Sequence, residues 1–484
     1  MNRFSIAWVL FLAVTIEALI SIPLLNWELA GGASRIPPVA IALPFAALLF
    51  LIIWKWRALW SRLLSNLSAS LQTITTRRWV ILCFILGALL RILWAWGYPS
   101  PQHSDQATYI QLARALAENH RYEVSGGGIA YWPPGYPFFL AAWFSLLGVH
   151  AWIPLLTNIL LYGGTLIVIE RLATRIAGPA AGKIATALLV AWPTLVMSAI
   201  LASKEMLILF LLSLTLLLFA RAQESETSAR SLALVVLSGL LLGCACLTQP
   251  SVQLFPAVLV AYVFLRRQFL LRGFGYIVIL GLALSAVILP WTFRNHRVLG
   301  AWVPVSTNGG VNFYGANNSL ATGAYTAERE QSLESYDEVT RGKVGFRLGK
   351  EWIRDHPRQF LALVIRKEIL FLGDDAQGAY ETLKRGLGIG GLPYVAWKGL
   401  SNLYWLLLWT SILLALAVHW RTLYSQDALL AAVMLGVLYL FAIHSVFESG
   451  SKYHQPVSGF LAVLAALAFV GPADPRKNTG VSQL

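Results

Sequence analysis

Runs of apolar residues alternate with short polar turns along most of the chain. A helix needs about 20 such residues to cross the hydrocarbon core of a membrane. The pattern therefore predicts an all-α polytopic membrane protein with about twelve transmembrane helices. The predicted spans cover residues 4–25, 37–54, 79–97, 152–170, 184–201, 205–221, 231–249, 252–266, 273–291, 402–420, 427–446 and 455–471.

Two longer polar stretches, 98–150 and 292–400, interrupt this pattern and are predicted to be loops on the outer side of the membrane. Part of the second stretch, 357–373, is amphipathic and carries charged residues, which is typical of a juxtamembrane helix lying in the interface. We therefore divide the chain into 1–78, with two N-terminal spans and a basic cytoplasmic loop, and 79–484, with the membrane core and both outer loops.

Composition and charge agree with a membrane protein. With 57% hydrophobic and 12% charged residues, the chain of 484 residues has too little polar surface to be soluble. A net charge of +14 would suit nucleic acid, but the basic residues gather in alternate loops, as expected when cytoplasmic loops retain Lys and Arg. Both termini are therefore predicted to be cytoplasmic, with no nucleic-acid partner. This orientation requires 134–150 to lie along the outer face instead of crossing.

Asp105 begins an amphipathic stretch just beyond the outer end of the third predicted span. Ser104 suits the N-cap, and Tyr109 follows on the same side at helical spacing. The helix dipole favours an ionised carboxylate in the first turn, so Asp105 either accepts a proton or binds a cation, or merely starts a helix. The glycines at 126–128 and the prolines within 131–137 are typical of a hinged loop beside a rigid wall, or of an ordinary connector.

A second acid, Glu205, follows Lys204 at the outer end of a later predicted span. A Lys–Glu pair at a membrane boundary often only extends its charges to water. The charge rule nevertheless places Glu205 on the same face as Asp105, and two carboxylates there can divide proton abstraction and cation or substrate binding. Asp105 and Glu205 are therefore the candidate catalytic residues, and a divalent cation is left open.

Basic side chains near the outer face are candidate phosphate contacts. Arg294, His296 and Arg297 follow the ninth predicted span, and guanidinium groups suit phosphate oxygens, although such arginines are also common headgroup anchors. Lys452, Tyr453 and His454 precede the last predicted span. The residues predicted to bind substrate are Tyr109, Lys204, Arg294, Arg297, Lys452 and Tyr453.

Several motifs in order resemble the membrane glycosyltransferases of the C superfamily: SDQATYIQLARAL, YWPPGYPFFLA, the acid of the later outer turn, PWTFRN, STNGG, GANN and KYHQPVSGFLAVLAAL. The resemblance covers about 79–470 and is nearest to the bacterial aminoarabinose transferases and the protein O-mannosyltransferases of family 39. It implies inverting transfer of a sugar from a polyprenyl-phosphate donor to a lipid, glycan or protein acceptor. The site would face the non-cytoplasmic side of the bacterial plasma (inner) membrane.

In this resemblance Asp105 matches the acid of the first outer loop and Glu205 that of the second, while Arg294 and Lys452 would face the donor phosphate. Many relatives carry a double acid where this chain has Gln106 after Asp105, which weakens the case for a metal. The chemistry requires activation of the acceptor hydroxyl and stabilisation of the departing phosphate. Asp105 would be the general base, Glu205 a helper or cation ligand, and Arg294, Arg297 and Lys452 the phosphate contacts.

Two other functions are compatible with the sequence. A transporter or flippase of a lipid-linked sugar would need polar or broken helices near the middle of the membrane. Most titratable residues instead lie at the outer boundary, with Glu17 and Arg91 as the main exceptions, and the sequence identifies no partner for Glu17. A noncatalytic scaffold of an envelope assembly complex is the third alternative.

Overall fold

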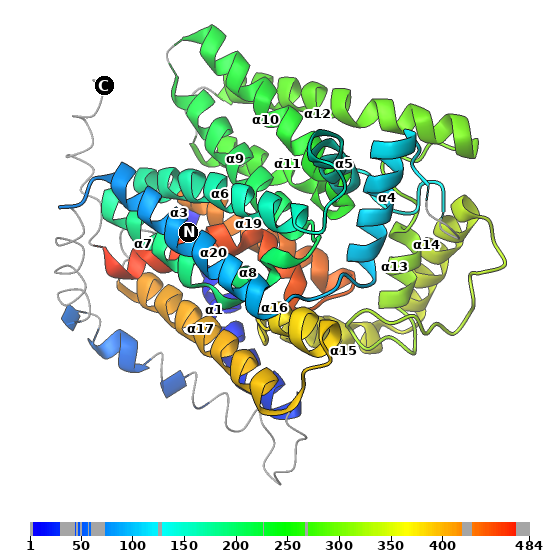
Figure 1. The fold of residues 1–484 in the computed structure, drawn as a ribbon. Helices are drawn as coiled ribbons and strands as arrows, with labels where there is room; N and C mark the ends of the chain where they lie inside the picture. Colours follow the sequence, from blue (N-terminus) through cyan, green and yellow to red (C-terminus); the bar gives the residue numbers. More distant parts are fainter. Residues whose placement is uncertain are drawn as a thin grey trace.

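The computed structural model describes residues 3–29, scattered residues between 44 and 59, and 73–470 with gaps at 124–127, 226, 267–269 and 419–427. The described residues form an all-α bundle (Figure 1), which confirms the predicted fold class. Eight helices are long and apolar enough to span a membrane. These are α1 (Arg3–Leu29), α3 (Thr76–Gly97), α6 (Ile153–Ala177), α9 (Glu205–Glu224), α10 (Ser228–Thr248), α12 (Leu270–Leu299), α17 (Gly391–Val418) and α19 (Ala428–Val446).

Four of the predicted spans do not correspond to one long helix. The predicted span 37–54 falls mostly outside the described residues. The predicted span 252–266 is the shorter α11 (Pro256–Arg266) with a preceding 3-10 turn. The last predicted span consists of three short pieces. They are η4 (Ser451–Val457), α20 (Ser458–Ala466) and η5 (Leu467–Phe469).

The fourth exception, 184–201, bends by 58° between α7 (Pro179–Ala191) and α8 (Pro193–Met197). Pro193 lacks a backbone N–H and restricts the residue before it to an extended conformation, so an apolar helix breaks there. Trp192 adopts that extended conformation, with φ −71° and ψ 106°. If the bent pair counts as one span, the described residues contain up to nine.

The helix α12 extends beyond its predicted end at 291 and stops at Leu299. The residues Arg294, His296 and Arg297 therefore lie on the last turns of a continuous helix, although the sequence placed them in the segment that follows the span.

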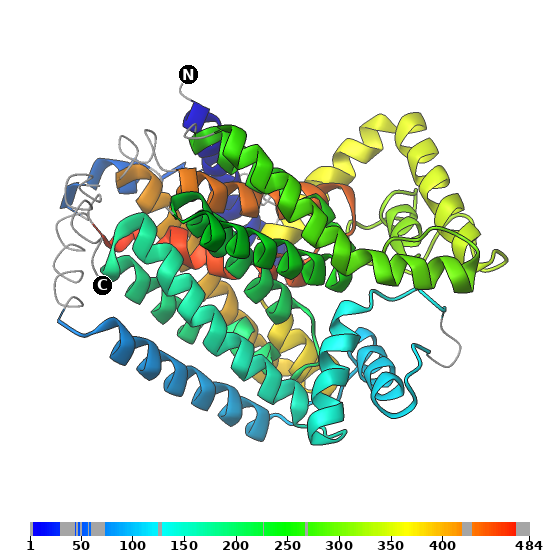
Figure 2. The same cartoon turned by 90° about the horizontal axis from the view of Figure 1, so that it is seen from above.

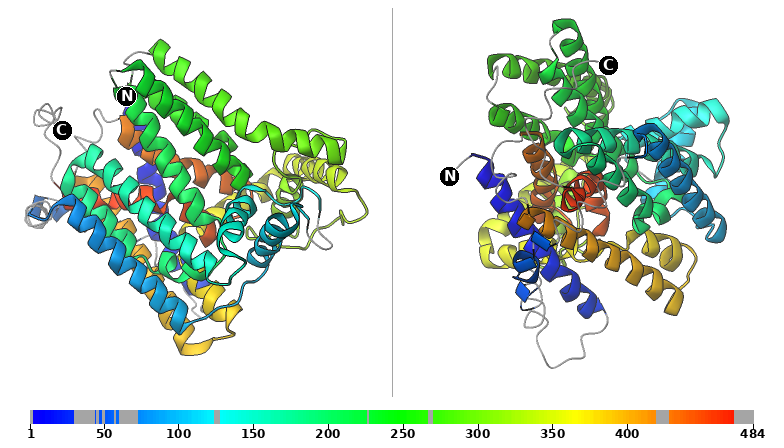
Figure 3. Two further views of the ribbon diagram at one scale, coloured as in Figure 1. Left: turned by 45° about the horizontal axis from the view of Figure 1, so that its top comes forward. Right: turned by 90° about the vertical axis from the view of Figure 1, so that its left-hand side faces the viewer.

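Three helices from the polar segments 98–150 and 292–400 lie at one end of the bundle (Figure 1). Figures 1 and 2 show α4 (Asp105–Asn119), α13 (Gly309–Ala316) and α14 (Glu338–Asp355) together at this end, beyond the long apolar helices. Figure 3 shows that α9, α10 and α12 form one flank of the bundle and α17 another. The two segments predicted to be juxtamembrane helices are helical, as α5 (Gly135–Leu147) and α15 (Pro357–Leu372), and their position at the membrane surface stays a prediction.

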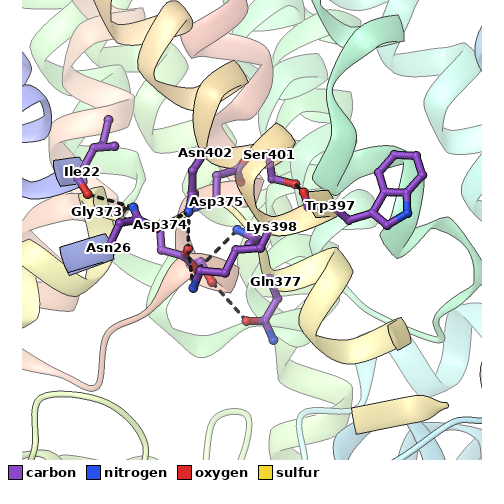
Figure 4. A network of polar contacts seen from close by, with 12 residues as sticks. Ile22, Asn26, Gly373, Asp374, Asp375, Gln377, Trp397, Lys398, Ser401 and Asn402 are labelled. Atoms are coloured by element: carbon purple, nitrogen blue, oxygen red, sulfur yellow. Dashed lines mark hydrogen bonds and ion pairs between the residues drawn. The ribbon is translucent and has the colours of Figure 1, made fainter. Parts of the chain in front are cut away.

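The N-terminal helix α1 packs against the rest of the bundle through α15, α17 and α19. Its Asn26 donates to the carbonyl of Gly373 at 3.2 Å and accepts from the Asn402 amide at 2.7 Å. The same Asn402 amide donates to Asp374, which pairs with Lys398 at 3.1 Å (Figure 4). The predicted N-terminal segment is thus joined to the core by a polar network.

The fold also supplies the partner for Glu17 that the sequence did not identify. Its carboxyl interacts with the carboxyl of Glu368 on α15. Glu368 in turn accepts from the Ser445 hydroxyl at 3.1 Å.

Candidate functional site

The helix α4 begins at Asp105, as predicted, but its first turn is not capped as expected. Ser104 occupies the N-cap with a positive φ of 47°, and its side chain makes no capping hydrogen bond. The side-chain oxygen of Gln106 instead accepts from the backbone N–H of His103 at 3.1 Å. The Asp105 side chain remains 41% exposed at the positive end of the helix.

Lys452 lies at the centre of a cluster of charges around Asp105. Its Nζ is 3.7 Å from Asp105 Oδ2, and it also interacts with Glu448, Glu205 and Lys204. Burial lowers the pKa of Lys452, but the three carboxylates outweigh burial, so the net shift of this pKa is upward. Both candidate acids therefore act on one ammonium group, which brings Asp105 and Glu205 into the same site.

Tyr109 forms the floor of this cluster. Its side chain is only 3% exposed, and its ring contacts Trp132 and Tyr136 edge-on, with centroids 5.8 and 5.4 Å apart. Burial, and after it the charges of Asp105 and Glu205, raise the pKa of Tyr109, so the phenol keeps its proton. The predicted substrate contact is thus a packed aromatic residue beneath the two acids.

The structure adds Glu448, which the sequence analysis did not identify. The Tyr453 hydroxyl donates to the Glu448 carboxylate, and the Lys452 ammonium lies 5.0 Å from the centre of the Tyr453 ring. Burial, followed by the charge of Glu448, raises the pKa of Tyr453. An acid four residues before Lys452, in FESGSK, was the signal available in the sequence.

The segment that carries Lys452 is held by a buried hydrogen-bond network. His454 Nε2 lies 2.9 Å from Asp375 Oδ1, and its Nδ1 lies 2.7 Å from the carbonyl of Phe371. Asp375 Oδ2 also accepts from Trp192 Nε1 at 2.7 Å, and the His454 ring stacks on Trp405. Since His454 and Asp375 are both 0% exposed, His454 serves as an anchor and not as a phosphate contact.

Glu205 lies between the outer cluster and a small inner cavity. This cavity, of about 10 Å³, is lined by Arg91, Asn158 and Gln455 together with Glu205. Arg91 is 1% exposed, donates to the carbonyl of Gly87 at 2.9 Å, and stacks 3.7 Å from the Tyr162 ring centre. One of its terminal nitrogens has no partner among the described residues. Arg91 and Glu205 thus line the same small cavity.

Arg294 belongs to a different set of contacts. It donates to the carbonyl of Ile129 at 2.8 Å, and its guanidinium lies 4.6 Å from the Trp291 ring. The backbone N–H groups of Ile129 and Ala130 donate to the Glu338 carboxylate at 2.6 and 2.8 Å. Arg294 therefore holds the loop before α5 in place. Its neighbour Arg297 is exposed, and neither arginine contacts Lys452.

The acids of the cluster do not form a metal site of the usual kind. In the part of the chain that the structure describes, no group of three or more His, Cys, Asp and Glu side chains is placed to hold a metal ion. Asp105 is followed by Gln106, and its carboxylate pairs with the Lys452 ammonium at 3.7 Å.

Comparison with known proteins gives one family match and several structures of similar fold. Residues 132–291 match the family described as dolichyl-phosphate-mannose-protein mannosyltransferase. The archaeal oligosaccharyltransferase AglB from Archaeoglobus fulgidus, solved with an inhibitory peptide and a dolichol-phosphate, has a similar fold. The TM-score is 0.51 at 12% identity, and the alignment covers 82% of this chain. The chain spans only half of the archaeal protein's length, 50%.

A second similar structure is that of ArnT from Cupriavidus metallidurans bound to undecaprenyl phosphate. It has a TM-score of 0.43 and 15% identity over 82% of this chain and 78% of the other. A search among curated proteins gave no match. The family match over residues 132–291 and the fold similarity to AglB agree with the predicted resemblance to C-superfamily membrane glycosyltransferases.

Proposed function

We propose that this protein transfers a sugar, with inversion, from a polyprenyl-phosphate carrier to an acceptor hydroxyl on the non-cytoplasmic side of a membrane. The observation that carries this proposal is the accessible Asp105 carboxylate, 3.7 Å from the Lys452 ammonium and in one cluster with Glu205. An accessible base beside a cation is what acceptor activation and phosphate departure require. The dolichol-phosphate and undecaprenyl phosphate of the similar structures support this donor class.

In the proposed step Asp105 is the general base. The acceptor oxygen bonds to the anomeric carbon of the sugar from the side opposite the phosphate, and its proton passes to the Asp105 carboxylate. The bond between that carbon and the phosphate oxygen breaks, and the electron pair leaves with the phosphate. Inversion needs only this one base and no covalent sugar–enzyme intermediate.

In this proposal the Lys452 ammonium binds the departing phosphate and stabilises its negative charge. Its ion pair with Asp105 is long, and the two side chains are 32% and 41% exposed, so the pair contributes little stability. The ammonium can therefore exchange Asp105 for the donor phosphate, which also frees the carboxylate to accept a proton. Glu205 helps by orienting the ammonium, and Lys204 adds a second positive charge near the same position.

The test is Asp105→Asn in reconstituted enzyme with a polyprenyl-phosphate sugar. We expect transfer to fall by about a hundredfold or more, the contribution typical of a general base. Glu118→Gln, on the exposed far end of the same helix, is the matched control and keeps its rate. Transfer by Asp105→Asn at the wild-type rate would contradict the proposal, and passage of the lipid-linked sugar across vesicles without product would favour transport.

For location, we infer a bacterial plasma membrane with both termini cytoplasmic and α4 outside. The membrane-spanning helices support an integral membrane protein, and the distribution of Lys and Arg supports this orientation. Labelling of a Glu118→Cys variant by an impermeant maleimide in intact cells checks it. Labelling only after the cells are opened would show that α4 lies on the cytoplasmic side, which contradicts the inferred orientation.

A further inference from the structure

The polar residues beside Asp105 and Lys452 are joined by a chain of hydrogen bonds that the proposed chemistry does not use. Gln106 follows Asp105 on α4, and Ser451 precedes Lys452 on η4. These two residues are linked through Gln377 and Glu381, which lie on the segment after α15. Glu381 lies in a short π-helix, Tyr380–Gly386, a form found frequently at functional sites.

The geometry of this chain of contacts is continuous. Gln106 Nε2 donates to Glu381 Oε2 at 3.1 Å, and Gln377 Nε2 donates to Glu381 Oε1 at 3.1 Å. The Ser451 hydroxyl then donates to Gln377 Oε1 at 3.1 Å. Gln106 and Glu381 are 8% and 7% exposed, so breaking these hydrogen bonds would leave buried polar groups unpaired.

The charge of Glu381 determines the direction of every hydrogen bond. Its ionised carboxylate only accepts, and it receives the amides of Gln106 and Gln377 as well as Arg385, whose Nη1 lies 3.3 Å away. An acid at position 106 would place a second carboxylate against Glu381.

We propose that Gln106, Glu381, Gln377 and Ser451 form a brace that sets the position of Asp105 relative to Lys452. The brace crosses from α4 to η4 beneath an ion pair whose own attraction is weak because both partners are partly exposed. The four brace residues are positioning residues that act through Asp105 and Lys452. This role rests on the proposed function, in which the base and the phosphate contact must be held at a defined separation.

A reciprocal exchange tests the brace. Gln106→Glu alone places a second carboxylate against Glu381 and should lower kcat by about tenfold with little change in KM. Glu381→Gln alone still offers an amide partner to Gln106 and should lower kcat by less than about tenfold. The double variant Gln106→Glu with Glu381→Gln restores the hydrogen bond with its polarity reversed and should recover kcat to within about threefold of wild type. If both single variants keep the wild-type kcat, or the double variant is no better than Gln106→Glu, the brace is overturned.

A second measurement does not depend on activity. With Cys83, Cys244 and Cys246 changed to alanine, Asp105→Cys and Lys452→Cys are crosslinked by a short bis-maleimide. Their ion pair is then absent, so their proximity depends on the brace. The yield should fall severalfold when Glu381→Leu is added and remain high with Glu381→Gln; equal yields in both overturn the brace.

The two proposals can fail separately. If Asp105→Asn transfers sugar normally, the proposed function fails, while the crosslinking yields still decide the brace. If Asp105→Asn is inactive but the reciprocal exchange restores neither kcat nor crosslinking, the proposed function stands and the brace fails. Thermal unfolding of each variant confirms that a lost rate is not a lost fold.

Discussion

Lys452 and His454 lie two residues apart on the same short helix, η4, but one side chain is partly exposed and the other is buried. Lys452 is partly exposed among three carboxylates and pairs with Asp105 at 3.7 Å. His454 is fully buried, with a partner on each ring nitrogen and an aromatic ring against its face. The comparison separates the two requirements of a reactive site: the anchor is completely satisfied, whereas the residue it carries remains free to change partners.

The largest expected effect follows from breaking the anchor. His454→Phe keeps the ring that stacks on Trp405 but leaves Asp375 with Trp192 as its main side-chain partner in the interior. A buried polar group that loses its hydrogen-bond partner typically costs about 1–3 kcal/mol, and here Asp375 and the Phe371 carbonyl both lose one, so this variant should unfold at a clearly lower temperature in detergent. An unchanged unfolding temperature would show that the buried pair does not hold η4.

Removing the Lys452 ammonium should have a smaller effect on stability and a specific effect on the transfer rate. Lys452→Met should lower kcat/KM by about a hundredfold, because a preorganised charge at the departing phosphate is lost. Its thermal stability should change little, since a partly exposed ion pair contributes about 1 kcal/mol or less. Lys452→Arg should recover part of the rate. A wild-type transfer rate in Lys452→Met would show that Lys452 does not stabilise the departing phosphate.

The smallest effect concerns the titration of Lys452. In the wild type the acids hold its pKa above the ordinary value, so the ammonium stabilises the fold until the pH rises through that raised pKa. Asp105→Asn removes one attraction and lowers the pKa, which increases the fraction of reactive free amine at a fixed, mildly alkaline pH. Trace acylation read by mass spectrometry should therefore label Lys452 severalfold faster in Asp105→Asn, at about tenfold per pKa unit. The exposed Lys350 serves as an internal reference, and equal labelling would contradict the pairing.

The sequence predicted well the features that depend on neighbouring residues. Apolar length was sufficient to place most spans, and the start of α9 at Glu205 follows from the charged pair at that boundary. The start of α4 at Asp105 also follows from local signals. Local pattern was less informative where apolar character continues through a break, as at Pro193, or where polar residues continue a helix, as in α12.

Long-range partners lay beyond sequence reasoning. Asp105 and Lys452 are 347 residues apart in the chain, and nothing in either local motif specifies that they meet. The same holds for Gln106 and Glu381, and for Glu17 and Glu368. Arg294 shows the opposite outcome, since its local context suits a phosphate but its guanidinium is occupied by the loop at Ile129.

By itself the sequence determined that this chain is a membrane protein of apolar helices with Asp105 and Glu205 at helix ends, because hydropathy and the cost of burying charge act through residue type alone. Tertiary packing alone decided which charges share one site. It joined Asp105, Glu205 and Lys452, buried His454 with Asp375, and sent Arg294 elsewhere. Electrostatic and hydrogen-bond partners depend on separation in space, which falls within a few ångströms only after the helices have packed.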